Sequence, residues 1–263
     1  SVTEFDDNTM IRIFETIQTW YFTVANQFVG DVAKLSGKLV TATLEVYQAV
    51  IKEMLPTPTK SHYVFNLRDF ARVHAGICMA KPDQIDNPEK AIRLWIHETY
   101  RVFYDRLVDH KDREWFYEHT RTALKDGFGK AMDKVFAHLD ADGDGNIDMD
   151  EMDQMMFGNF ANPDKRVLDE VTDFEAMQTT VEEYLSDYNS VSKTPLPLVL
   201  FNFCIQHVSK IARILALEGG NALLVGVGGS GRQSLTRLAS HIQECEVFQI
   251  EISKNYAYTD WLD

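Results

Sequence analysis

The sequence predicts a mainly α-helical fold, in which a helical bundle is followed by the opening of a βαβ unit. Two observations lead to this fold class. In the first half of the chain, apolar residues recur every three or four positions, which is the period of a helix packed on one face. From residue 222 onward, short apolar or alternating runs flank a glycine cluster, a pattern typical of two strands joined by a turn and a helix.

The first half is expected to form five helices. In the first of them, four apolar residues recur at helical spacing: Ile13, Ile17, Trp20 and Val24. Pro56 and Pro58 stop the second helix, and Pro88 suits the first turn of the fourth. The expected helices cover residues 9–29, 31–55, 66–79 and 88–108, and a fifth runs from residue 112 to the glycines at 127 and 129.

The second half is expected to change from helices to a mixed pattern. An acidic helix is expected over residues 173–188, and Pro195 and Pro197 mark a boundary after it. The expected order beyond the boundary is a helix over 201–215, a strand over 222–225, a helix over 233–243 and a strand over 246–252.

The composition indicates a folded chain with an acidic surface. Its 263 residues are 45% hydrophobic, and the formal net charge is -14. This charge argues against nucleic-acid binding and against docking on anionic membranes. No apolar run reaches the roughly 20 residues that a membrane helix needs, and no signal peptide is visible. The three cysteines are widely spaced and indicate a reduced chain, which is expected to be cytosolic or nuclear.

Residues 140–151 read D-A-D-G-D-G-N-I-D-M-D-E and match an EF-hand calcium loop at every ligand position. Three carboxylates, a backbone carbonyl, a further carboxylate and a bidentate glutamate supply the oxygens that calcium prefers, and Gly145 allows the sharp turn. The expected ligands are Asp140, Asp142, Asp144, Asn146, Asp148 and Glu151. The alternative is a solvated acidic loop without an ion.

Helices are expected on both sides of this loop, so that the EF-hand covers residues 129–157. Their apolar faces would be Val135, Phe136 and Leu139 before the loop, and Met152, Met155 and Met156 after it. The methionines suit either the core or a groove that opens with calcium. Ile147 stands where such loops usually pair with a neighbouring strand. Only one such loop is visible, whereas EF-hands usually occur in pairs, so weak calcium binding is expected.

Residues 226–233 read G-V-G-G-S-G-R-Q and resemble a phosphate-binding loop between a strand and a helix. The backbone N–H groups of such a loop cradle phosphates. Arg232 replaces the usual lysine, and Gln233 replaces the hydroxyl residue that holds magnesium, so ATP or ADP binding without efficient hydrolysis is expected, with Mg²⁺ doubtful. The expected nucleotide-binding residues are Gly226, Val227, Gly228, Gly229, Ser230, Gly231, Arg232 and Gln233. The alternative is a glycine-rich turn without a ligand.

Four stretches resemble axonemal dynein heavy chains: residues 62–77, 192–215, 219–240 and 248–256. The family consists of ATP-driven, minus-end-directed microtubule motors built on a ring of six AAA+ modules. The resemblance implies that residues 1–120 end the third module with its last large-subdomain helix and its helical lid. With the EF-hand placed over 121–157, the resemblance further implies a helical connector over 158–192 and the start of the fourth module over 193–263. An ATPase also needs a Walker B acid on a later strand, so the chain is expected to be a fragment without a complete catalytic site.

The resemblance also assigns residues and partners. Arg68 matches a sensor-2 arginine that faces the nucleotide of the third module, and its alternative role is a surface ion pair. Leu198 and Val199 match a segment near adenine, with core packing as the alternative. The implied partners are the rest of the dynein ring, microtubules, and light or intermediate chains or actin-type subunits, in the axoneme of a cilium or flagellum.

The calcium loop departs from most of the family, and we associate it with single-headed inner-arm types, where it is expected to act on the connection between the two modules. Two other functions fit the sequence less well. A stand-alone calcium sensor or buffer is disfavoured by the missing second EF-hand. A P-loop NTPase of another class is disfavoured by the lid-like helices before the P-loop.

Overall fold

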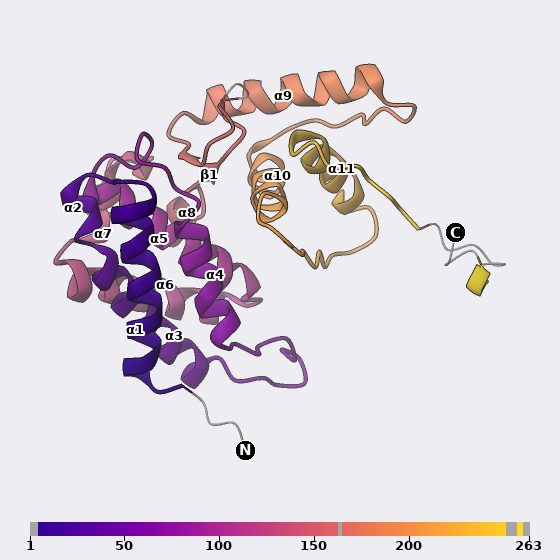
Figure 1. The fold of residues 1–263 in the computed structure, drawn as a ribbon. Coiled ribbons are helices and arrows are strands. Elements are labelled where there is room, and N and C mark those ends of the chain that lie inside the picture. The colour runs from indigo at the N-terminus through magenta and orange to yellow at the C-terminus, as the bar shows by residue number, and fades with distance from the viewer. Residues whose placement is uncertain (1–4, 163–164, 251–256, 260–263) are drawn as a thin grey trace.

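The computed structural model describes residues 5–162, 165–250 and 257–259. It consists of a helical bundle, formed by residues 5–152, and a smaller group of three helices beside it (Figure 1). The bundle contains α1 (Asp7–Trp20), α2 (Gly30–Ala33), α3 (Ser36–Glu53), α4 (Leu67–Ile77), α5 (Pro88–Val102), α6 (His110–Phe128), α7 (Met132–Val135) and α8 (Met149–Met152). The smaller group contains α9 (Phe174–Val191), α10 (Asn202–Leu215) and α11 (Arg232–Ile242).

Local signals in the sequence set the starts of the bundle helices. Asn66 and Asp69 form a capping box at the start of α4, in which each side chain accepts a hydrogen bond from the backbone at the other end of the turn. Asn87 caps α5, and Pro88 occupies its first turn, where no backbone N–H is needed. Asp109 caps α6. These capped starts lie within two residues of the expected ones.

Several helix ends differ from the expectation. Residues 31–55 form two helices, α2 and α3, instead of one, and α5 ends at Val102 before a 3₁₀ turn over Tyr104–Arg106. Gly127 lies inside α6 and does not break it. Gly129 does end that helix, because it adopts a left-handed conformation with φ of 66° that glycine reaches without strain.

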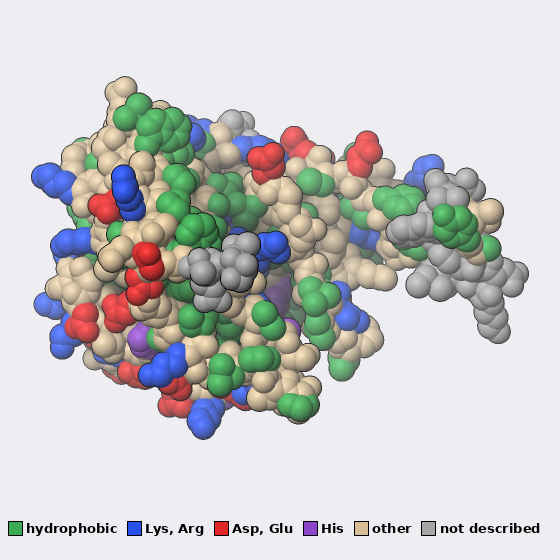
Figure 2. All heavy atoms as spheres, turned by 60° about the horizontal axis from the view of Figure 1, so that its bottom comes forward, with side chains coloured by type: hydrophobic (Ala, Val, Ile, Leu, Met, Phe, Trp, Pro, Cys, Tyr) green, Lys and Arg blue, Asp and Glu red, His purple; other side chains and the backbone are tan. Residues whose placement is uncertain are grey.

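The first helix forms as expected but its apolar stripe does not face the bundle. The exposed fractions of Ile13, Ile17, Trp20 and Val24 are 39%, 51%, 56% and 64%. The buried residues of this segment are Met10, Gln18 and Phe22. A π-helical turn over Tyr21–Ala25 extends α1. Figure 2 shows hydrophobic side chains at the surface of the molecule.

The two strands expected around the glycine cluster do not form in the described residues. Residues 222–225 and 246–250 make no strand pairing, and residues 251–252 lie outside the described part. The exposed fractions of Leu223 and Val225 are 87% and 86%. A parallel strand requires hydrogen-bonded neighbours and cover on both faces, and the described chain supplies neither at this position. The helix expected after the cluster does form, as α11.

A two-stranded antiparallel ribbon occurs instead in the connector, where only helix was expected. β1 (Phe157–Gly158) pairs with β2 (Asp169–Glu170), with Phe157 opposite Glu170 and Gly158 opposite Asp169. Among the described residues, no helix is long and apolar enough to cross a membrane. Cys78, Cys204 and Cys245 are free thiols.

Among the described residues, the two larger hydrophobic cores lie in the bundle and between α9, α10 and α11. The segment that follows α8 contributes to both. Met155 and Phe157 lie in the bundle core, whereas Met156 and Phe160 lie in the other. Residues 155–160, which we call the seam, therefore join the two cores directly after the candidate calcium loop.

Candidate metal centre and phosphate loop

Three expected calcium ligands converge in the structure. Carboxylate oxygens of Asp140, Asp142 and Asp144 lie within 4.8 Å of one another, the one such acidic group among the described residues. Gly143 and Gly145 turn the chain between them with φ of 76° and 78°, values in the left-handed region. The sharp turn expected at Gly145 is present, and the three carboxylates face one small volume.

The last expected ligand lies beside the first. Glu151 accepts hydrogen bonds from the backbone N–H of Ala141 at 2.7 Å and of Asp148 at 3.1 Å. Asp140 accepts from the N–H of Gly143 at 2.7 Å and of Gly145 at 3.0 Å. The two ends of the loop are therefore held together. The donors are all hard oxygens, with no thiolate or imidazole among them, so the set fits calcium.

The helices beside the loop are shorter than expected. The incoming side consists of α7, which has four residues, and a 3₁₀ turn over Ala137–Leu139, and the outgoing α8 also has four residues. After α8 ends at Met152, the chain becomes extended and forms β1 from Phe157. Met152, Met155 and Met156 are 1%, 9% and 5% exposed. In this structure the methionines are core residues, and they do not form an open groove.

Three residues around the loop were not expected from the sequence. Tyr117 and Arg121 lie on α6, and Asp133 lies on α7. Tyr117 donates a hydrogen bond to the Ile147 carbonyl, and Asp133 accepts from the Ile147 N–H at 3.1 Å. Arg121 pairs with Asp133 at 2.6 Å. The spacing of Tyr117 and Arg121, four residues apart on a helix, places them on one face, but nothing local points that face at residue 147.

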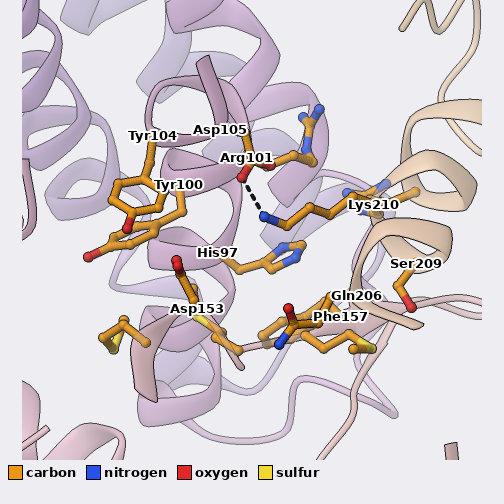
Figure 3. A pocket seen from close by; sticks show the side chains of 14 residues that line it. His97, Tyr100, Arg101, Tyr104, Asp105, Asp153, Phe157, Gln206, Ser209 and Lys210 are labelled. Carbon is orange, nitrogen blue, oxygen red and sulfur yellow. Dashed lines mark hydrogen bonds and ion pairs between the residues drawn. The ribbon is translucent and has the colours of Figure 1, made fainter. Parts of the chain in front are cut away.

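A small cavity of about 30 Å³ lies between α5, the start of the seam and α10. Figure 3 shows the side chains that line it: His97, Tyr100 and Arg101 come from α5, Gln206, Ser209 and Lys210 come from α10, and Asp153 and Phe157 come from the segment after α8. The dashed line marks the 2.6 Å ion pair between Lys210 and Asp105. The seam thus contacts both helices across this cavity.

A buried ionic cluster closes the same interface. Glu98 of α5 is fully buried and pairs with Arg213 of α10 at 2.7 Å and with Arg101 at 2.8 Å. Burial raises the pKa of Glu98, but the nearby Arg213 and Arg101 lower it more, and the pKa lies well below its usual value. Glu98 is therefore charged, and both of its oxygens are used.

The glycine cluster forms an exposed turn at the N-terminus of α11. Gly229 and Gly231 adopt φ of 81° and 79°, and Arg232 is the first helical residue. The Arg232 guanidinium turns back onto the Leu224 and Val227 carbonyls, at 3.5 Å and 3.3 Å. The N–H groups of a helix N-terminus favour anions. The turn thus has one feature of a phosphate site, while its arginine is engaged with the loop itself.

The other residues expected to contact nucleotide do not share one site. Arg68 is exposed in the first turn of α4. Leu198 packs against the second core, whereas Val199 is 82% exposed. Their proposed roles at nucleotides stay predictions.

Comparisons with known proteins identify the class of this architecture. A model of the AAA+ lid domain matches residues 39–138, and a model described as the P-loop containing dynein motor region D4 matches residues 196–263. The helical bundle thus contains an AAA+ lid, and α10 and α11 lie in a dynein P-loop region.

Individual relatives agree with this class. The chain is 43% identical over 263 residues to dynein axonemal heavy chain 3 of Mus musculus, covering 99% of this chain and 6% of the relative. It is 41% identical over 265 residues to dynein axonemal heavy chain 12 of Homo sapiens, covering 99% of this chain and 8% of the relative. Nearly the whole chain therefore corresponds to a region of axonemal dynein heavy chains, which supports the resemblance at the level of this family; the single-headed inner-arm type and the EF-hand stay predictions. It spans less than a tenth of the length of these relatives.

Proposed function

We propose that this chain is part of an ATP-driven, minus-end-directed microtubule motor that slides ciliary or flagellar microtubules. The match to the dynein D4 motor region and the identity to axonemal heavy chains support this role. In the proposal, residues 1–120 end the third AAA+ module, 121–157 form the EF-hand, 158–192 connect the modules, and 193–263 begin the fourth. Its proposed partners in the axoneme are the rest of the dynein ring and microtubules. The motor is proposed to be of the single-headed inner-arm type.

The second part of the proposal is that residues 140–151 bind one calcium ion. Asp140, Asp142, Asp144 and Glu151 would hold it through carboxylates, Asn146 through its backbone carbonyl and Asp148 directly or through water. The single observation that carries this proposal is the convergence of the first three carboxylates, with Glu151 held beside them. A bound calcium ion would offset two of the six negative charges of this loop.

The third part is that calcium regulates the contact between the lid and the P-loop region. Glu151 precedes the seam by four residues, and the seam contributes side chains to both cores. A movement of Glu151 toward a bound cation would be passed to α8 and then to Met155 and Met156. Packed cores change between discrete arrangements instead of deforming smoothly, so a small shift there alters how α10 sits on α5.

The fourth part concerns nucleotide. The P-loop at 226–233 is proposed to bind ATP or ADP through backbone N–H groups, with little hydrolysis at this site, because Arg232 and Gln233 replace the usual lysine and magnesium-binding hydroxyl. The comparison with the D4 region supports nucleotide binding. Arg68 is proposed to face the nucleotide of the third module.

Titration calorimetry with calcium tests the metal site. Wild type, Glu151→Gln and Asp150→Asn are compared, because Asp150 is an exposed loop carboxylate at a position that supplies no ligand. We expect one calcium per chain for wild type and Asp150→Asn, and binding that is weakened at least tenfold for Glu151→Gln. Equal binding by all three variants, or none by wild type, contradicts the site. Microtubule gliding by the whole motor, with and without Glu151→Gln, then tests regulation.

A further inference from the structure

The backbone of Ile147 is paired within the chain. This residue is at loop position eight, where paired EF-hands usually bond to the neighbouring loop. Here its N–H donates to Asp133 Oδ1 at 3.1 Å, and its carbonyl accepts from the Tyr117 hydroxyl. The side chain is only 1% exposed and packs in the bundle core. Both backbone groups and the side chain of position eight are thus satisfied without a second hand.

Arg121 fixes the two side chains that make these bonds. Its Nη1 donates to the Tyr117 hydroxyl oxygen at 2.9 Å, and its Nη2 pairs with Asp133 Oδ2 at 2.6 Å. The same Nη2 donates to Asn146 Oδ1 at 3.1 Å. The Asp133 carboxylate offsets the positive charge of Arg121 beside the acidic loop. Positions seven and eight of the loop are therefore held from α6 and α7.

We propose that Tyr117 and Asp133 are positioning residues that take the place of a second EF-hand, so that the loop binds calcium in a monomeric chain. This inference rests on the proposed calcium site. A loop that is already ordered loses less conformational freedom when it binds an ion. Each of these side-chain bonds is worth about 0.5–1.5 kcal/mol, which corresponds to roughly a 2- to 10-fold change in calcium affinity.

The test combines calcium titration calorimetry with a measurement of molar mass by light scattering. It uses the whole chain as wild type, Tyr117→Phe, Asp133→Asn and Tyr184→Phe. Tyr184 is the matched control, because its buried hydroxyl has no hydrogen-bond partner among the described residues. A circular-dichroism melt confirms that each variant is folded at the titration temperature.

We expect wild type and Tyr184→Phe to bind one calcium per monomer with equal affinity. Tyr117→Phe and Asp133→Asn are expected to bind roughly 2- to 10-fold more weakly while remaining folded. A merely structural role would shift the melt and leave the affinity of the folded chain unchanged, which overturns the inference. Calcium-dependent dimerisation of wild type also overturns it. If wild type binds no calcium, the proposed site fails as well, so the two failures are distinguishable.

Discussion

Arg213 of α10 and Glu98 of α5 form an ion pair of 2.7 Å whose side chains are 1% and 0% exposed. The two residues are 115 positions apart in the sequence, and the pair joins the lid to the P-loop region. Arg213 also donates to the Gly76 carbonyl at 3.2 Å, so it reaches α4 as well. The paired charges are costly to bury, and removal of one partner would leave the other charge buried and uncompensated.

Breaking the buried pair is expected to be strongly destabilising. Glu98→Gln leaves the Arg213 charge buried without its partner, at a cost of about 3–5 kcal/mol in the free energy of unfolding. Asp105→Asn is the control, because it breaks the nearby Lys210–Asp105 pair, whose side chains are 39% and 26% exposed. That pair should contribute about 1 kcal/mol or less. Urea unfolding compares the two variants. Equal losses in their free energy of unfolding would show that burial does not set the cost of breaking an ion pair here.

Gly76 makes room for the ionic cluster. A Cβ atom built on Gly76 would lie 1.8 Å from Glu98 Oε2, whereas one on Gly127 of α6 would lie 3.5 Å from the Ala42 Cβ. Gly76→Ala is therefore expected to destabilise the chain by about 1–3 kcal/mol through overpacking. Gly127→Ala should stabilise it by about 0.5–1 kcal/mol, because alanine is favoured in helices. Thermal melts of both variants test this, and a neutral Gly76→Ala would contradict the clash.

His74 should make stability depend on pH. Burial lowers the pKa of His74 to about 3 from an ordinary value of 6.5. Between these values the unfolded chain binds one more proton, so the stability present above pH 6.5 is lost as the pH falls toward 3. The loss in the free energy of unfolding approaches about 1.4 kcal/mol per pH unit.

Urea unfolding of wild type, His74→Gln and His110→Gln at pH 7.5, 6.5 and 5.5 checks this dependence. His110 is the control, because its side chain is 76% exposed. Wild type and His110→Gln should lose more stability on acidification than His74→Gln does. Parallel losses in all three would refute the assignment to His74.

Adjacent methionines in the seam should affect different parts of the molecule. Met155→Ala removes a side chain from the bundle core, and Met156→Ala removes one from the core of α9, α10 and α11. Each change should cost about 2–5 kcal/mol. Amide hydrogen exchange should become faster in α5 for the first variant and in α10 for the second. The same pattern in both variants would mean that the two cores do not open separately.

The sequence was sufficient for features that depend on neighbouring residues. The helix starts near residues 66 and 88, and the carboxylates at 140, 142 and 144, follow from local spacing, and they lie where expected. Features that depend on residues far apart in the sequence could not be predicted from local patterns. The Glu98–Arg213 pair joins residues 115 positions apart, and helical periodicity on α1 did not reveal that Ile17 and Trp20 face outward. The strand expected over 222–225 needs neighbouring strands as hydrogen-bond partners, and the local pattern does not show whether such partners are present.

The most direct test of the account is hydrogen exchange of the whole chain with and without calcium. It measures whether the calcium loop acts on the contact between α5 and α10. In wild type and Asp150→Asn, calcium should slow amide exchange in the seam and in α10, as well as in residues 140–151. In Glu151→Gln these changes should be absent. If wild type binds calcium but exchange changes only within residues 140–151, the loop is a metal site without an effect on the seam. That result would contradict the proposal that calcium regulates the contact between the lid and the P-loop region.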